Sequence, residues 1–321
     1  METNKAKRIV LAPMDGLADA VLRDVLTRCG QYDFCVTEFV RITDSLLPSR
    51  MFKKSGPELD HGCKTFAGTP VRVQLLGSDP ERLAQNAARL ASLNPAGIDL
   101  NFGCPAPTVN RHRGGAALLE EPELLHRIAS AVRQSVPAHI SFTAKMRLGL
   151  KDTALTLDCA RALAEGGIDE LTVHARTKLE MYNPPAHWHW IGRIADVLTI
   201  PVIANGEIWT MNDYQQCLAE SGVPDVMLGR GAVCDPFLSN RLRGLPVGGW
   251  DDLKPLIGHF WSRVIQTVVP KHAPGRLKNW LNYLQRTFPE AQELRHVIRP
   301  LTTIEAVSHC LTLNGIDSLH G

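Results

Sequence analysis

Short apolar segments alternate with longer amphipathic ones along most of the chain. Eight short segments have the length and residue types of buried strands: 8–12, 34–37, 71–75, 97–101, 140–146, 170–174, 201–205 and 225–228. Helical periodicity marks four of the stretches between them: 80–92, 122–135, 153–165 and 211–220. This repeat predicts an α/β fold, a TIM (β/α)8 barrel. A doubly wound open sheet would more often carry G-x-G-x-x-G after its first strand, where this chain has APMDG.

The pattern changes after Pro236. The stretch 243–252, RGLPVGGWDD, is rich in glycine and proline and is typical of a linker. Beyond it the periodicity is helical, with one apolar stripe made of Leu277, Trp280, Leu281, Leu284 and Phe288. We therefore predict a catalytic barrel over residues 1–243 and a small all-helical domain over residues 244–321.

Length, termini and cysteines exclude several classes of protein. No apolar run has the length of a membrane helix, and METNKAKRIVLAPMDG lacks the apolar core and cleavage site of a signal peptide. The eight cysteines include no C-x-x-C pair, which disfavours a zinc site and a disulfide framework. We predict a cytoplasmic monomer with no bound metal and no membrane contact.

Polar residues follow six of the eight predicted strands. They are Gln74, Asn101 with Cys104, Lys145 with Arg147, His174 with Arg176, 205–207 (NGE) and 229–231 (GRG). Strand ends meet at the face of a TIM barrel that carries the active site, so these side chains should converge. The glycines beside Arg230 are typical of a phosphate site after the last two strands, although GRG alone also suits a simple turn.

Cys104 lies between Gly103 and Pro105 at the end of a predicted strand. On frequency alone, a free cysteine is usually an inert buried thiol. A thiol at this place could instead be a nucleophile, which needs a base such as His174 and an oxyanion hole. It could also be a proton donor, which needs only its own proton. The residues alone leave these alternatives open.

The motifs APMDG, TEFV, VQLLG, DLNFGCP, KMRLG, VHART, VIANGEI and VMLGRGA have the order and spacing found in the tRNA-dihydrouridine synthases. The chain resembles that family over nearly its whole length, although Phe102 stands where a smaller or sulfur-bearing residue is common. TEFVR and GRLKNWLNYL are similar to the bacterial C subgroup, whose target is uridine 16 in the D-loop of tRNA. The resemblance implies FMN over the barrel mouth, reduction by NADPH, hydride transfer to C6 of the uridine, and protonation of C5 by a cysteine.

The resemblance also implies roles for individual residues, with Cys104 as the proton donor. The cofactor would be held by Pro13, Met14, Asp15, Gln74, Lys145, His174, Asn205, Gly206, Glu207, Gly229 and Arg230. The uridine, which must swing out of the RNA, would contact Asn101, Arg147 and Tyr182. The tRNA would be oriented by Arg41, Arg276, Lys278 and Arg299, and Tyr283 would stack or hydrogen-bond nearby.

Charge in the predicted helical domain gives separate support for an RNA partner. Residues 254–288 contain six lysines or arginines and no acidic residue, which is typical of a phosphate-contacting surface. The loop with Arg111, His112 and Arg113 could guide RNA or simply be solvated. Two other hypotheses are a flavoprotein acting on a free pyrimidine or other small alkene, and an RNA-binding module that has lost catalysis. The basic stretch disfavours the first, and the presence of Cys104 and Lys145 disfavours the second.

Overall fold

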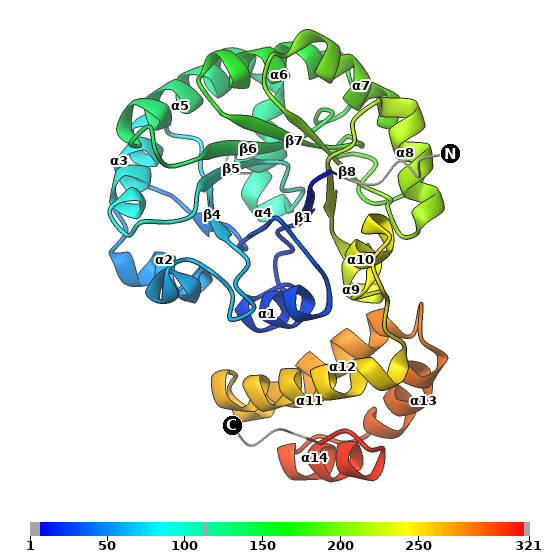
Figure 1. Cartoon of the computed structure of the whole chain (residues 1–321). Coiled ribbons are helices and arrows are strands. Elements are labelled where there is room, and N and C mark those ends of the chain that lie inside the picture. Colours follow the sequence, from blue (N-terminus) through cyan, green and yellow to red (C-terminus); the bar gives the residue numbers. More distant parts are fainter. Residues whose placement is uncertain (1–6, 112–113, 318–321) are drawn as a thin grey trace.

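Eight parallel strands close into a barrel in the computed structural model, which describes residues 7–111 and 114–317. The strands are β1 (Ile9–Leu11), β2 (Phe34–Val36), β4 (Val71–Leu76), β5 (Ile98–Phe102), β6 (Phe142–Arg147), β7 (Glu170–His174), β8 (Val202–Asn205) and β9 (Val226–Leu228). Each strand pairs with its neighbours, and β1 closes the barrel by pairing with both β2 and β9 (Figure 1). The predicted TIM barrel and its eight strands are confirmed.

A ninth strand, β3 (Val40–Arg41), was absent from the sequence prediction. It continues the line of β2 along β4, because Cys35 lies opposite Val71 and Val40 lies opposite Leu75. The chain advances five residues between the first and last of these pairs, while β4 advances four, so one extra residue is accommodated as in a β-bulge.

Helices surround the barrel, and most of them lie between one strand and the next along the chain (Figure 1). The longer ones are α1 (Ala20–Cys29), α3 (Pro80–Ala91), α5 (Pro122–Ser135), α6 (Thr156–Glu165), α7 (Trp188–Val197) and α8 (Met211–Ser221). Shorter helices are α2 (Ser49–Ser55), α4 (Pro107–Asn110), α9 (Arg230–Cys234) and α10 (Leu238–Arg243), with 3-10 turns at Pro57–His61, Gly115–Glu120 and Pro270–His272. Side-chain caps begin several of them: Asp79 accepts from the N–H of Arg82, and Thr210 forms a capping box with Asp213.

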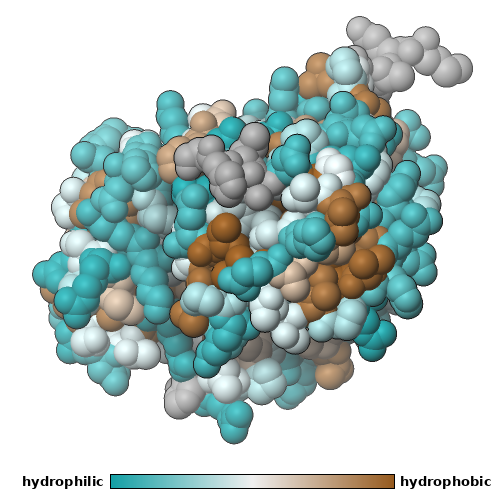
Figure 2. Space-filling model, turned by 90° about the horizontal axis from the view of Figure 1, so that it is seen from below, coloured by the Kyte–Doolittle hydropathy of each residue, from teal (hydrophilic) through white to brown (hydrophobic). Residues whose placement is uncertain are grey.

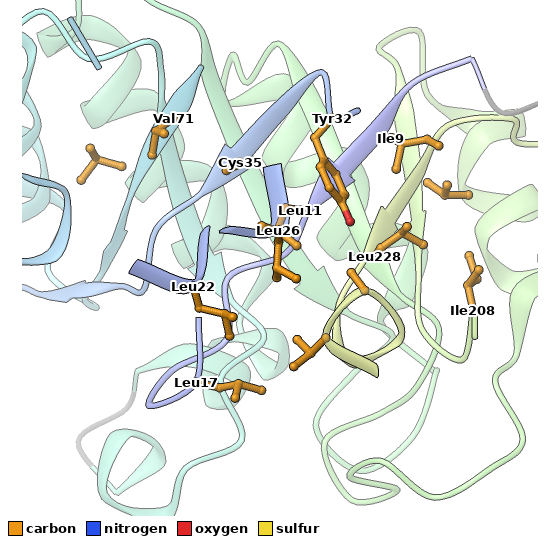
Figure 3. Close-up of a cluster of buried hydrophobic side chains, with 14 of the residues drawn as sticks. Ile9, Leu11, Leu17, Leu22, Leu26, Tyr32, Cys35, Val71, Ile208 and Leu228 are labelled. Carbon is orange, nitrogen blue, oxygen red and sulfur yellow. The ribbon is translucent and has the colours of Figure 1, made fainter. Parts of the chain in front are cut away.

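Alternation along the strands creates two apolar layers. Successive side chains of a barrel strand point into the barrel and out toward the helices. Ile9 and Leu11 belong to the outer cluster together with Leu22 and Leu26 of α1 (Figure 3). Val10, between them, belongs to a separate inner cluster, whose other members are Ala12, Phe34, Val36, Ile203 and Met227.

Charged side chains close the amino-terminal end of the barrel. Arg8 donates to Asp225 over 2.8 Å and pairs with Glu170, whose other oxygen accepts from Arg72 over 2.7 Å. The Arg72 guanidinium also lies 3.5 Å from the ring centroid of Phe34. Two cations and two carboxylates thus compensate one another in this floor of the barrel, which satisfies charges that would be costly to bury alone.

Four helices follow the barrel: α11 (Trp250–Thr267), α12 (Ala273–Leu284), α13 (Pro289–Ile298) and α14 (Ile304–Leu313). They lie below the barrel in Figure 1, where α11 packs on α1 and α12 packs on α9. The indole of Trp280 donates to the carbonyl of Val233 over 3.3 Å and lies 4.8 Å from the ring of Phe260. The predicted apolar stripe is buried in the same cluster as the barrel's outer layer. The domain boundary after residue 243 stays a prediction.

The face on the side of the C-terminal helices is mainly hydrophilic. Figure 2 shows hydrophobic residues gathered there only in small patches. Exposed apolar residues on or near these helices include Val247, Val269, Val297 and Leu313. Among the described helices, none combines the length and the apolar character that a membrane span requires.

A shared core between barrel and C-terminal helices has a measurable consequence. We expect Trp280→Ala to lower the free energy of unfolding by about 3–5 kcal/mol, because it removes a fully buried ring between α12 and the barrel. Urea denaturation followed by circular dichroism measures the change. Val297→Ala, on an exposed side chain of α13, is the control and should change stability by no more than about 0.5 kcal/mol. Equal effects of the two substitutions would contradict a shared core.

Candidate active site

A cavity of about 420 Å³ opens at the carboxyl ends of the strands. Its size lies in the range of sites for small molecules and cofactors. The lining includes the predicted catalytic residue Cys104 and all eleven predicted cofactor residues: Pro13, Met14, Asp15, Gln74, Lys145, His174, Asn205, Gly206, Glu207, Gly229 and Arg230. Asn101, Arg147, Tyr182 and Tyr283 line it as well, so the structure brings together side chains from every part of the barrel and from α12.

The turn that carries Cys104 is held by hydrogen bonds on both sides of its backbone. The Asn101 side-chain oxygen accepts from the N–H groups of Gly103 and Cys104, each over 2.9 Å. The carbonyl of Cys104 accepts from the Asn110 side chain over 3.0 Å and from the N–H of Ala116 over 3.2 Å. These contacts fix where the thiol lies at the end of β5.

Gly115 lies in the loop that follows Cys104 and allows that loop to approach the Cys104 backbone closely. Its φ is +60°, in the left-handed region, and a Cβ added there would lie 2.8 Å from the Cys104 carbonyl oxygen. Glycine at this position therefore lets the loop pack directly against the Cys104 turn. Arg111 is exposed in the same loop, whereas His112 and Arg113 lie outside the described residues.

The Cys104 thiol has an apolar environment at the edge of the cavity. It is 8% exposed and packs with Leu76 and Val109, next to Phe39. Burial raises the pKa of the Cys104 thiol, only partly opposed by a hydrogen bond from the backbone of Ala106. The thiol therefore keeps its proton at neutral pH, which suits a proton donor better than a nucleophile.

Lys145 and His174 face the cavity from neighbouring strands. Loss of hydration, together with the positive charge of Arg147, lowers the pKa of Lys145 to about 7, although Asp99 acts in the opposite direction. Burial is also the largest cause of the lowered pKa of His174, and the cations around it add to the effect. At neutral pH His174 is therefore an uncharged imidazole, and Lys145 lies near the midpoint of its titration.

Arg147 contacts backbone as well as the cavity. It is 1% exposed and donates to the carbonyls of Gly103, Thr177 and Met181 over 2.8–2.9 Å. Its guanidinium also lies 5.2 Å from the ring centroid of Tyr182. Arg147 thus connects the Cys104 turn to the loop after β7, a contact that the sequence analysis did not predict.

The opposite side of the cavity combines glycines with cations. Gly206 has φ +113°, and a Cβ there would lie 2.7 Å from the His174 ring. Arg176 pairs with Glu207, yet its buried Nη1 has no hydrogen-bond partner in the described structure. The Arg230 guanidinium lies 4.7 Å from the ring centroid of Tyr182 and 5.1 Å from that of Trp209. Close backbone approach and a guanidinium group beside it are what a phosphate-bearing ligand requires.

Glu38 and Trp209 line the cavity although the sequence analysis did not select them. Glu38 accepts from the N–H of Gly16 over 2.6 Å at the junction between β2 and β3. Trp209 donates to Glu207 over 3.0 Å and is covered by Arg286, whose guanidinium lies 3.8 Å from its ring. Trp209 follows the NGE motif by two residues, and that proximity was the available signal.

Four of the residues predicted to orient tRNA lie outside the cavity. Arg41 and Arg299 are exposed. Arg276 forms an ion pair with Asp19 over 2.6 Å, and the Lys278 ammonium donates to the carbonyl of Leu301 over 2.6 Å. These two cations thus have partners within the protein, and they attach α12 to the loop before α1 and to the segment before α14.

Comparison with known proteins identifies the relatives of this chain. The family model described as dihydrouridine synthase matches residues 10–302. The chain belongs to the dihydrouridine synthase family. A protein of Ralstonia nicotianae named tRNA-dihydrouridine(16) synthase is 56% identical over 97% of this chain and 98% of its own length. Proteins of the same name from Cupriavidus necator and Neisseria meningitidis serogroup A are 58% and 47% identical, over 91% and 97% of this chain and 92% and 95% of their own.

A solved structure supports the fold alone. A 2-naphthoyl-CoA reductase, in a complex with 2-naphthoyl-CoA, matches 74% of this chain with a TM-score of 0.55 and 11% sequence identity. This chain spans half the length of that reductase chain.

The dihydrouridine synthase family consists of flavin-dependent oxidoreductases, and the cavity of this member contains the predicted cysteine, lysine and histidine. Within the described residues, no group of three His, Cys, Asp or Glu side chains is arranged to hold a metal ion.

The lowered pKa of Lys145 predicts how stability depends on pH. Between pH 7 and the ordinary lysine value of 10.5, the unfolded chain binds a proton that the folded chain has released. The buried charge of Lys145 therefore reduces the stability of the wild-type protein most below pH 7, and this stability recovers as the pH rises from 7 toward 10.5. In flavin-free protein we expect Lys145→Met to be stabilising at pH 6, with a smaller difference from wild type at pH 9. Urea denaturation at both pH values measures this.

The control for this prediction is Lys151→Met, because the Lys151 side chain is 73% exposed. It should change stability equally at pH 6 and pH 9. A pH-independent difference for Lys145→Met would mean that Lys145 titrates normally in the folded protein.

Proposed function

We propose that this chain reduces the C5=C6 bond of uridine 16 in tRNA to give dihydrouridine, with FMN as cofactor and NADPH as reductant. Family membership supports the reaction, and the names of the relatives support the position of the uridine. The observation that carries the proposal is the placement of Cys104 in one cavity with Lys145 and His174, and burial that raises the pKa of the Cys104 thiol agrees with it. A cytoplasmic, monomeric enzyme is consistent with a tRNA substrate.

The cavity fits FMN by its volume and by the chemistry of its two sides. Asn205, Gly206, Glu207, Gly229 and Arg230 would hold the phosphate, and Arg176, which does not line the cavity, pairs with Glu207 from behind it. The ring would lie against 13–15 and against the side chains of Gln74, Lys145 and His174. When bound and reduced by NADPH, FMN supplies the hydride for C6 of the uracil.

The protein's own residues supply the proton and the charge balance. Cys104 gives its thiol proton to C5 of the uracil, and the resulting thiolate is stabilised by the positive charges of Arg147 and Arg41. Lys145 supplies a positive charge where the reduced cofactor ring needs one. His174, which is neutral, can donate one hydrogen bond without adding a further cation.

The four C-terminal helices, within residues 244–321, would form the tRNA-binding domain. The acid-free stretch 254–288 supplies cations on this side of the molecule, and α12 brings Tyr283 to the cavity mouth. Arg41, Arg276, Lys278 and Arg299 would orient the tRNA, while Asn101, Arg147 and Tyr182 would contact the swung-out uridine. A free pyrimidine would need none of this surface, which favours a uridine within RNA.

Mapping dihydrouridine in cells tests the proposal. We expect tRNA from cells lacking this protein to lose dihydrouridine at position 16 and to keep it at positions 17 and 20. Wild-type protein from a plasmid should restore it. Cys104→Ala should not, because general acid catalysis typically contributes about 10²–10⁴-fold to a rate.

The purified Cys104→Ala protein should still bind FMN and oxidise NADPH, since the thiol acts only on the uracil. Cys310→Ala, which changes a buried thiol of α14 outside the cavity, is the matched control and should restore position 16. Full restoration by Cys104→Ala would remove the proposed role, and loss at another position would overturn the assignment to uridine 16.

Binding of tRNA should depend on exposed cations at the cavity mouth. We expect Arg41→Ala to weaken tRNA binding and to reduce the salt slope of the binding constant by about 1, as for one lost phosphate contact. FMN content should not change. Filter binding at several salt concentrations measures both affinity and slope. Arg161→Ala, on the exposed side of α6, is the control, and equal losses for the two variants would contradict a specific contact by Arg41.

A further inference from the structure

Asp99 lies inside the barrel, directly beneath the cavity. It is 3% exposed and does not line the cavity itself. On β5 it precedes Asn101 by two residues, so both side chains point into the barrel. One oxygen of Asp99 accepts from the Gln74 side-chain N–H over 2.7 Å, and the other accepts from the Thr143 hydroxyl over 2.6 Å.

A chain of hydrogen bonds runs upward from Asp99 to the Cys104 turn. The side-chain oxygen of Gln74 accepts from the Asn101 side-chain N–H over 2.7 Å. The oxygen of Asn101 then accepts from the N–H groups of Gly103 and Cys104. Gln74 is fully buried, so losing its partners could not be compensated by solvent.

The two ends of this chain fix the direction of every bond in it. An ionised Asp99 has no hydrogen to donate, so it can only accept from Gln74. If Asp99 is protonated on the oxygen that faces Thr143, its other oxygen still accepts from Gln74. The Gln74 oxygen must then face Asn101, and the Asn101 oxygen must face the turn. The backbone N–H groups at the other end can only donate, which requires the same direction.

We propose that Asp99 is a positioning residue that holds the Cys104 turn in place through the Gln74 and Asn101 carboxamides. Asp99 touches neither the thiol nor the cavity. It opposes the lowered pKa of Lys145, and it acts on the Cys104 turn through the hydrogen bonds described above. The inference rests on the proposed role of Cys104 as proton donor. It gives a buried carboxylate, which sequence analysis did not select, a place in the proposed mechanism.

Asp99→Asn keeps the shape of the side chain but removes one of the two constraints on direction, the one at the buried end of the chain, so that only the backbone N–H groups of the turn still favour the original direction. The new amide group can donate to Gln74, which allows Gln74 to turn over and present its own N–H to Asn101. Asn101 would then turn as well and direct its N–H toward the N–H groups of Gly103 and Cys104. The turn would lose two hydrogen bonds, each worth about 0.5–1.5 kcal/mol.

The rate at which iodoacetamide alkylates Cys104 in the flavin-free protein tests this directly. Digestion and mass spectrometry of the Cys104 peptide separate this thiol from the other cysteines. We expect Asp99→Asn to alkylate about tenfold faster than wild type, because a turn held by fewer hydrogen bonds opens more often. Asp225→Asn, the same substitution in the floor of the barrel, should leave the rate unchanged.

A compensating variant separates direction from simple loss of stability. The double variant Asp99→Asn with Gln74→Glu again gives Asn101 an acceptor and matches every donor with an acceptor. Its alkylation rate should return close to the wild-type rate, and it can be measured even if Asp99→Asn alone does not fold. A wild-type rate in Asp99→Asn, an equal increase in Asp225→Asn, or a fast rate in the double variant would each overturn the proposal.

Turnover gives the second readout. In the flavin-loaded enzyme we expect Asp99→Asn to lower kcat for tRNA about tenfold with KM for tRNA unchanged, because the substitution acts inside the barrel and leaves the tRNA-binding surface intact. If the wild-type enzyme reduced no uridine, the proposed function would fail, but the alkylation rates would still decide whether Asp99 holds the turn.

Discussion

The hydrogen bonds that the Asn101 carboxamide accepts from Gly103 and Cys104 connect the barrel to the cavity. They turn the chain sharply where β5 ends, and the thiol lies at the edge of the cavity as a result. Asn101 can accept them because Gln74 binds its N–H, and Gln74 is oriented in turn by the neighbouring carboxylate. Barrel closure makes this possible, since it places side chains of adjacent strands in one layer.

Electrostatics in the cavity follows from the same closure. Strand ends that converge bring Lys145, Arg147, His174 and Arg230 close together, away from bulk water. Lost hydration, reinforced by the neighbouring positive charges, lowers the pKa of His174 and of Lys145, so the imidazole is uncharged and the lysine titrates near pH 7. The carboxylates of Asp15, Glu38 and Glu207 line the same cavity, so charges of both signs face the space that a ligand would occupy.

The sequence predicted the barrel, its eight strands and the polar strand ends that line the cavity, because carboxyl ends of parallel strands must meet, while the family resemblance added 13–15, Tyr182 and Tyr283. It could not predict β3, whose two residues are too short to show periodicity. The hydrogen bonds of Arg147 to backbone carbonyls could not be predicted either, because the sequence around a strand-end arginine is the same whether the arginine binds a ligand or backbone carbonyls. Gly115 belonged to a stretch interpreted as a basic loop, and only the fold reveals how closely it approaches Cys104. The hydrogen-bond and packing partners of a side chain depend on which residues lie near it in the folded protein, and the periodicity of the sequence does not contain this information.

The C-terminal helices and the cavity form one continuous unit. Trp280 is buried against α9, Tyr283 of the same helix lines the cavity, and Arg286 covers Trp209 beside Glu207. A tRNA bound to these helices would therefore meet the cavity at a fixed distance and angle, because the two regions share one hydrophobic cluster. Under the proposed function, the choice among D-loop uridines would be made by where the RNA backbone is held. Protonation by Cys104 would not distinguish one uracil from another, so specificity for one position would depend on the surface outside the cavity.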